Sequence, residues 1–336
     1  MVERGTRGYP LYFGAGMKLT SPGVSSACGR SGGARPTDDR YAGVELLRVL
    51  SCVGVAVFHL LPAGQPAFAG ARTIGYSGLF ALTAVMAGLA IPRRAQPASA
   101  VLKKRAARLL IPWLFWVAIF GGLMLVRRGL RGSPLLADLR WFDVLIGPRV
   151  HLWFLPFAFV TTVLIALAFR PAQRPGPWAI LLAAASIPAA IAAVQLGELG
   201  LPWKLYVTAA PAVLLGLALG RAAEGKDDTV WRCATCLAYA ASAAGTALLS
   251  SEGQAAWAHS AAALAVVVCF SWRSAAPPWL AWAASLSLGV YLVHPLCSDL
   301  LWGITASNPP LHVLAVILVS GALIACVQAT PLRQFV

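Results

Sequence analysis

Arg48 and His59 are the first residues in this 336-residue chain whose types and spacing could perform chemistry. His59 follows Arg48 by eleven residues, so on a helix both side chains share one face, roughly 16 Å apart along the axis. Glu45, three residues before Arg48, can pair with it. Facing lipid would cost either side chain several kcal/mol, which favours a face turned toward a bundle or cavity. The alternative is that Arg48 anchors the helix at the membrane interface and that His59 caps the far end of the helix, where it is exposed to water.

A second candidate group is basic and directly precedes the third apolar stretch. Arg105 and Arg108 stand three residues apart, so on a helix their guanidinium groups form one two-pronged surface. This geometry suits a phosphate-bearing ligand. The alternative is that both arginines anchor lipid head groups at the cytoplasmic face.

Two further groups combine histidine with an aromatic residue. His151 and Trp153 open the fourth apolar stretch, where the rings could stack on a sugar or belong to an interfacial aromatic belt. Tyr291 and His294 lie three residues apart on one face of the ninth stretch. A histidine in the middle of a membrane span is a candidate functional residue, with a structural hydrogen-bonding role as the alternative.

The elements that must position these residues are membrane helices. Hydrophobic residues make up 59% of the chain, charged residues only 12%, and the mean hydropathy is +0.73. A soluble domain carries about 25% charged residues. The sequence therefore predicts an all-α, polytopic membrane bundle of about ten transmembrane helices. The predicted spans are about residues 44–61, 72–92, 109–126, 151–169, 177–196, 205–220, 231–250, 254–272, 280–303 and 311–330.

The distribution of basic residues predicts the orientation and the domain organisation. Most of the 27 lysines and arginines fall inside if the N-terminus is cytoplasmic, which places both termini inside. Residues 1–40 are polar and lack a signal-peptide core, so they are expected to be a disordered cytoplasmic tail, with 41–336 as the transmembrane domain. The loop 127–150 carries five arginines but falls outside. Either this loop is a polar binding element at the outer face, which is the interpretation we favour, or one span has been miscounted.

Several other classes of function are disfavoured. The basic residues that give the net charge of +15 cluster in short loops between apolar spans, so no nucleic-acid partner is expected. The seven cysteines are odd in number and imply no disulfide framework. Cys233 and Cys236 have metal-like spacing but no second pair and no nearby histidine, so no metal is expected. His259 and His312 lie near the ends of predicted spans and are assigned no chemistry.

Taken in order, these motifs resemble the acyltransferase-3 family of integral membrane (sugar O-)acyltransferases. The resemblance covers about residues 41–300 and lies in Arg48 with His59, Arg105-Ala-Ala-Arg108, Leu152-Trp153-Phe154-Leu155, and Gly289-Val-Tyr291-Leu-Val-His294-Pro295. The family comprises ten-helix bacterial inner-membrane enzymes that O-acylate sugars of surface polysaccharides, oligosaccharides or antibiotics. The second span departs from the family pattern. Its residues 78–88 lack the Phe- and Ser-rich character that is usual in the family.

The resemblance implies a multi-pass inner-membrane acyltransferase. Its donor would be cytoplasmic acyl-coenzyme A, with acetyl favoured. Its acceptor would be a sugar hydroxyl of an exopolysaccharide, a lipopolysaccharide or a glycosylated metabolite. Membrane lipid and the machinery of polysaccharide biosynthesis are the other partners that it implies.

The resemblance also implies roles for individual residues. Arg105 and Arg108 would bind the coenzyme phosphates, and the pantetheine arm would follow the Arg48–Cys52–His59 stripe. His59 would be a general base or an acyl relay, with Arg48 and Glu45 completing the catalytic set. The acceptor would be bound by the remaining aromatic and histidine candidates: His151, Trp153, Tyr291 and His294.

Two alternatives from other classes stay open. One is a transporter or flippase of a lipid-linked saccharide, which the lack of internal repeats disfavours. The other is a catalytically silent relative that scaffolds a polysaccharide complex. Only the enzyme requires acyl-coenzyme A.

Overall fold

The computed structural model describes residues 41–61, 66–90, 97–134, 146–168, 185, 203–222, 262, 264–269, 271–272 and 274–336. Within these ranges the chain is helical and contains no strand, apart from one isolated bridge between Tyr41 and Ala275. The all-α class is therefore confirmed. The predicted tail and the predicted span 231–250 lie outside the described residues, as do Cys233, Cys236, His259 and all of the predicted span 177–196 except residue 185.

The helices follow the predicted spans closely. Their bounds are α1 Ala42–Leu60, α2 Pro66–Ala90, α3 Ala98–Leu130, η1 Val150–Trp153, α5 Phe154–Ala168, α7 Trp203–Ala222, α10 Pro278–Thr305, α11 Pro309–Gln328 and η3 Pro331–Phe335. The main difference is α3, which begins at Ala98 rather than near 109. The prediction used apolar residues alone, whereas the basic residues that precede them are good helix formers with no breaker among them.

Five of these helices are long and apolar enough to cross a membrane, judged by length and composition. They are Ala42–Leu60, Ala98–Leu130, His151–Ala168, Pro278–Thr305 and Pro309–Gln328. α2 and α7 contain shorter apolar stretches, Ser77–Gly88 and Ala209–Ala218. The described part of the chain is thus a polytopic membrane bundle.

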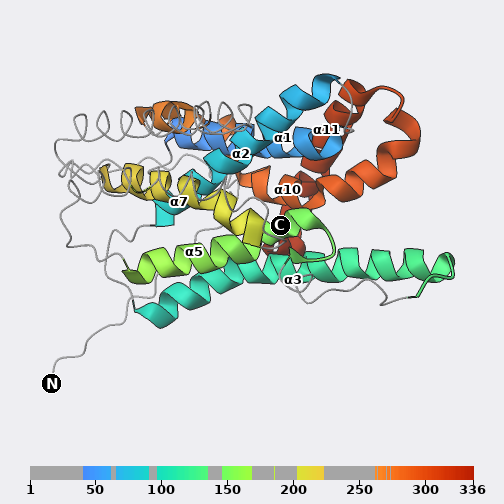
Figure 1. The fold of residues 1–336 in the computed structure, drawn as a ribbon, viewed down its shortest axis with the longest axis horizontal. Helices are drawn as coiled ribbons and strands as arrows, with labels where there is room; N and C mark the ends of the chain where they lie inside the picture. Colours follow the sequence, from blue (N-terminus) through green and yellow to red (C-terminus); the bar gives the residue numbers. More distant parts are fainter. Residues whose placement is uncertain are drawn as a thin grey trace, which may run out of the picture. The chain divides into compact units, whose positions relative to one another are not determined.

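α2 packs on both α1 and α7, α10 packs on α1 and α11, and α3 packs on α5 (Figure 1). The backbone N–H of Ala42 donates to the Ser274 carbonyl at 2.9 Å, so α1 and α10 begin side by side. Further along, the Cys52 thiol donates to the Ser287 carbonyl at 3.1 Å. α1 and α10 are therefore parallel, which requires an odd number of membrane crossings between them. The spans predicted between these two helices satisfy that parity.

Small residues allow α2 to approach its two neighbours. A Cβ added to Gly78 would lie 2.7 Å from the Ser51 carbonyl oxygen on α1, and a Cβ on Gly216 of α7 would collide with the Ala84 carbonyl of α2. Membrane helices pack closely at such positions because the backbones can touch. The small residues of α2 therefore allow close packing of this helix against α1 and α7.

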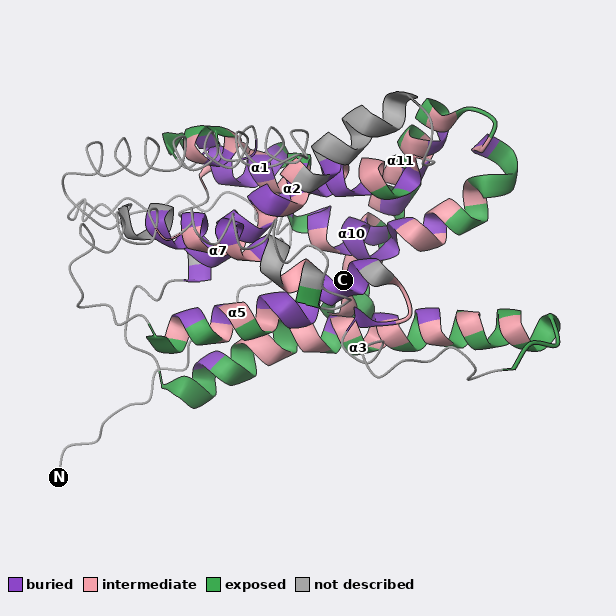
Figure 2. Cartoon of the chain, viewed as in Figure 1, coloured by how far each residue is buried: buried purple, intermediate pink, exposed green. Residues whose placement is uncertain are grey.

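Buried residues concentrate where α1, α2, α5, α7 and α10 meet, while α3 shows mostly intermediate and exposed positions (Figure 2). Large apolar side chains such as Leu114, Val126 and Leu318 are exposed on α3 and α11. Lipid is as apolar as leucine, so these faces suit contact with the hydrocarbon of the bilayer.

His312, on α11, joins the two helices of the α10–α11 hairpin through side-chain hydrogen bonds. Its Nδ1 lies 2.7 Å from Thr305 Oγ1, and its Nε2 lies 3.0 Å from Ser298 Oγ. Thr305 Oγ1 donates its own proton to the Leu301 carbonyl, so it accepts from His312 Nδ1–H. The Ser298 hydroxyl then donates to His312 Nε2. Sequence analysis assigned no chemistry to His312; the structure gives it a stabilising role.

Replacing His312 should destabilise this hairpin. His312→Ala leaves the buried Thr305 hydroxyl and the half-buried Ser298 hydroxyl without their ring partner, which costs about 1–3 kcal/mol. Thermal unfolding of the detergent-solubilised protein should therefore begin several degrees lower. The matched control is Leu314→Ala, on the same helix and 54% exposed, which should shift unfolding little. Equal unfolding curves for wild type and His312→Ala would contradict the stabilising role.

Candidate active site

Three histidine rings meet where α1 ends, η1 begins and α10 passes its midpoint. The ring centroids of His59 and His294 are 5.7 Å apart, those of His151 and His294 are 5.5 Å apart, and those of His59 and His151 are 6.3 Å apart. We call these three residues the histidine cluster. They were predicted separately, from three different apolar stretches, and the fold brings them together.

Pro295 fixes the proton position on His294. In a regular helix the N–H of residue 295 would donate to the Tyr291 carbonyl, but proline has no N–H. His294 Nδ1 replaces that donor at 2.8 Å from the Tyr291 carbonyl oxygen. Because a carbonyl only accepts, Nδ1 carries the proton and Nε2 keeps its lone pair. His294 is fully buried, and its Nε2 has no hydrogen-bond partner among the described residues.

His151 is held from two sides. The Tyr291 hydroxyl donates to the His151 carbonyl, which ties η1 to α10. The edge of Phe120, from α3, lies against the imidazole with ring centroids 5.5 Å apart and planes at 90°. His151 is 4% exposed, and its Nε2 also lacks a partner within the described part of the chain. Buried polar atoms are almost always paired, so two unpaired imidazole nitrogens side by side mark a candidate ligand or substrate position.

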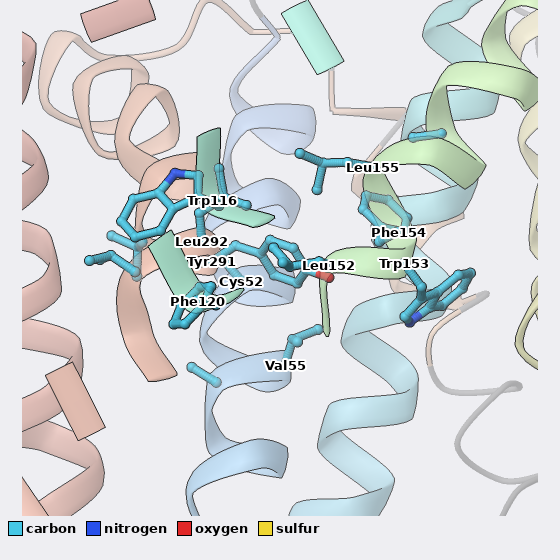
Figure 3. Close-up of a cluster of buried hydrophobic side chains, with 14 of the residues drawn as sticks. Cys52, Val55, Trp116, Phe120, Leu152, Trp153, Phe154, Leu155, Tyr291 and Leu292 are labelled. Atoms are coloured by element: carbon cyan, nitrogen blue, oxygen red, sulfur yellow. The ribbon is translucent and has the colours of Figure 1, made fainter. Parts of the chain in front are cut away.

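His59 is the exposed member of the cluster, so it is the ring that a molecule from outside the bundle can reach. Figure 3 shows the core of buried hydrophobic side chains to which Tyr291 belongs, with Tyr291 close to Cys52 and Leu152. In the described ranges no group of three or more His, Cys, Asp or Glu is placed to hold a metal ion. The arrangement can supply proton acceptors and hydrogen-bond donors to a reacting group.

Arg48 and Glu45 are not part of the cluster. Arg48 Nη1 lies 2.9 Å from Glu45 Oε2, which confirms the predicted ion pair, but the pair lies roughly 16 Å from His59 along α1. Cys52 lies between them, buried and bonded to the Ser287 carbonyl, and Val55 is buried in the same core. These two members of the stripe therefore serve helix packing, and the path of a pantetheine arm stays a prediction.

Arg105 and Arg108 lie on the first turns of α3 as predicted, Arg105 half-buried and Arg108 exposed. Phe120, which contacts His151, follows them by twelve to fifteen residues on the same helix. The arginine pair is therefore about 18–22 Å from the cluster along the helix axis.

Comparison with known sequences decides the family. The profile of a family described as "Acyltransferase domain" matches residues 41–329. The chain belongs to the acyltransferase-3 family. Neither the curated proteins nor the solved structures gave a match. With its apolar helices, the chain is a membrane acyltransferase, and the matched region contains every candidate residue considered above.

In this acyltransferase Trp153 has a packing position. It is 4% exposed, and its ring lies 5.3 Å from Phe157, 5.9 Å from Tyr206 and 6.0 Å from Phe154, measured between centroids. The expected stacking of a sugar on Trp153 is not supported, because aromatic side chains cover its ring. The physical reason is local: in the tight η1 turn, residues two apart point in different directions, so His151 faces the cluster and Trp153 faces away.

Three charged residues of the acyltransferase lie near the cluster and were not among the predicted site residues. Asp299 Oδ2 accepts from Arg127 Nη2 at 3.0 Å and from Arg149 Nη2 at 2.6 Å. A carboxylate inside an otherwise apolar span was the available signal, since such residues are costly in lipid and are usually functional. The arginines belong to the loop that we interpreted as a polar element at the outer face.

Proposed function

We propose that this membrane acyltransferase moves an acyl group, with acetyl favoured, from acyl-coenzyme A to a hydroxyl of a saccharide. The observation that carries the proposal is the histidine cluster. Two buried imidazoles with unpartnered Nε2 atoms stand directly beside the exposed ring of His59. A hydroxyl that reaches His59 from outside is thereby adjacent to groups that accept and donate protons.

The reaction needs few groups. The acceptor oxygen attacks the thioester carbonyl, the new C–O bond forms, and the C–S bond breaks. His59 takes the hydroxyl proton as general base and returns it to the leaving thiolate. The same imidazole could instead carry the acyl group as a relay. His294 Nε2, with its lone pair fixed by the bond from Nδ1, is placed to hold the acceptor hydroxyl or to share the proton.

The donor is proposed to bind at the cytoplasmic end. Arg105 and Arg108 would hold the coenzyme phosphates, since guanidinium groups bind phosphate in bidentate geometry. The pantetheine arm then has to cross about 18–22 Å to the cluster. Since Cys52 and Val55 are packed in the core, the arm is proposed to run on the side of α3. No metal takes part in this scheme.

The acceptor is proposed to be a sugar of an exopolysaccharide, a lipopolysaccharide or a glycosylated metabolite. Tyr291 positions His151 through its carbonyl, so these two residues and His294 form the acceptor side of the site. The enzyme would lie in the bacterial inner membrane with both termini cytoplasmic. It would be surrounded by lipid and would work beside the polysaccharide biosynthesis machinery.

The test is an acyl-transfer assay. Membranes that contain the wild-type protein, and membranes that lack it, are supplied with radiolabelled acetyl-coenzyme A and glycans of the host. We expect alkali-labile label in the glycan only when the protein is present. Glycan that crosses the membrane without acquiring label would contradict the proposal and favour a flippase.

The arginine pair on α3 gives a prediction about the donor. Arg105→Ala with Arg108→Ala should raise the KM for acetyl-coenzyme A by about 10- to 100-fold, because charge-assisted bonds to phosphate are lost, while the KM for the glycan stays constant. Initial rates measured over a range of donor concentrations decide this. The control, Lys103→Ala with Lys104→Ala, removes two exposed charges one turn earlier and should change little. An unaltered donor KM in the arginine variant would return Arg105 and Arg108 to lipid anchoring.

A further inference from the structure

A charged pocket lies beside the histidine cluster, between the end of α3, the residues before η1, and α10. Its volume is about 260 Å³, and its charged lining consists of Arg127, Arg131, Arg149 and Asp299. Phe120 and three other uncharged residues, Leu123, Met124 and Pro148, complete the wall. We call it the arginine pocket.

The charges in the arginine pocket do not balance. Three guanidinium groups face one carboxylate, and a single oxygen of Asp299 serves both Arg127 and Arg149. Arg131 has no side-chain hydrogen bond to any residue that the structure describes. Each guanidinium has five N–H donors, so most donors in the pocket have no acceptor among the residues that the structure describes.

The pocket is open to a ligand. The side chains of Arg127, Arg149 and Asp299 are 51%, 39% and 29% exposed. A hydrated anion can therefore reach the guanidinium groups without disrupting the bundle. On the predicted orientation this end of the bundle is the outer face, where the acceptor would approach.

Phe120 connects the pocket with the cluster. It forms part of the pocket wall, its edge contacts His151, and the Arg149 guanidinium lies 6.0 Å from its ring centroid. Arg149 also precedes His151 by only two residues. One aromatic ring thus separates the positive pocket from the imidazoles, so one saccharide could contact both.

We infer that the acceptor is an anionic saccharide whose carboxylate or phosphate group binds in the arginine pocket while a hydroxyl lies at the histidine cluster. This inference rests on the proposed function and specifies the acceptor class. Arginine forks match the two oxygens of a carboxylate or phosphate, which fixes both position and orientation. Asp299 is the counter-ion that holds the arginines in place until the substrate anion arrives.

Equilibrium binding to the purified full chain, without acyl-coenzyme A, tests this inference separately from catalysis. The probes are a tetrasaccharide with one glucuronate, its carboxyl-reduced form, and that reduced form carrying one phosphate monoester. At low ionic strength the two anionic probes should bind about 10- to 100-fold tighter than the neutral one. The relative affinity of the two anionic probes distinguishes carboxylate from phosphate.

Two variants sharpen the test. Arg131→Gln should lower the affinity for the anionic probes about tenfold or more and leave the neutral probe unaffected. It breaks no ion pair within the described residues, so folding should be intact. Asp299→Asn removes the competing carboxylate and should strengthen binding of the anionic probes. Lys103→Gln, at the other end of α3, is the control for a lost positive charge.

Three results would overturn the inference. One is equal binding of the neutral and anionic tetrasaccharides by the wild-type protein. Another is unchanged binding of the glucuronate probe by Arg131→Gln. The third is displacement of that probe by phosphatidylglycerol in mixed micelles but not by free glucuronate, which would assign the pocket to a lipid head group. A failure of the proposed function would appear separately, as absence of label transfer by the wild-type protein.

Discussion

Replacement of His59 by alanine is expected to abolish measurable acyl transfer while the protein still inserts into the membrane. His59 is the exposed ring of the histidine cluster, and under the proposed function it is the group that an acceptor hydroxyl meets first. Removal of a general base lowers rates by about 10²- to 10⁴-fold. Label incorporation from acetyl-coenzyme A into glycan, normalised to the protein content of the membranes, measures the effect.

Leu50→Ala provides the matched control on the same helix. Leu50 is 55% exposed and lies away from the cluster, so its variant should keep wild-type activity. Activity in His59→Ala within a few-fold of Leu50→Ala would remove His59 from the mechanism.

His294→Phe should also cause a large loss of activity, by a separate route. Phenylalanine keeps a ring in the buried site but removes the lone pair of Nε2, so transfer should fall by about 10²-fold or more. It also removes the donor to the Tyr291 carbonyl, which costs about 1–3 kcal/mol of stability. Transfer rate and thermal unfolding are measured on the same preparation.

A second substitution separates these two effects. Pro295→Ala restores a backbone N–H that can donate to the Tyr291 carbonyl. The double variant His294→Phe/Pro295→Ala should therefore regain stability and remain inactive. Recovery of activity together with stability would show that His294 acts only through the helix.

The class of fold could be predicted because the period and length of apolar stretches report membrane helices directly. The start of α3 was placed too late, since a helix that extends out of the membrane loses its hydropathy signal but keeps its helix formers. The tight contacts of Gly78 and Gly216 were not predictable, because they depend on which helices are neighbours. Sequence alone gives no such pairing.

The site was predicted in part. His59, His151 and His294 were identified one by one, because titratable residues stand out in apolar spans. The sequence did not predict that these three rings lie together. Their contact depends on the parallel packing of α1 and α10 and on the hydrogen bond from Tyr291 to η1. The packing of Trp153 could not be predicted, because a stacking residue and a packing residue have the same sequence signature.

The most direct test of the central claim is a structure of the protein with a carba analogue of acetyl-coenzyme A, in which a methylene group replaces the thioester sulfur. The analogue cannot transfer its acyl group, so it reports where the reacting carbon binds. We predict the acyl carbonyl at the histidine cluster, within hydrogen-bond reach of His59 or His294, and the diphosphate at Arg105 and Arg108. An acyl end that binds away from all three imidazoles would contradict the account.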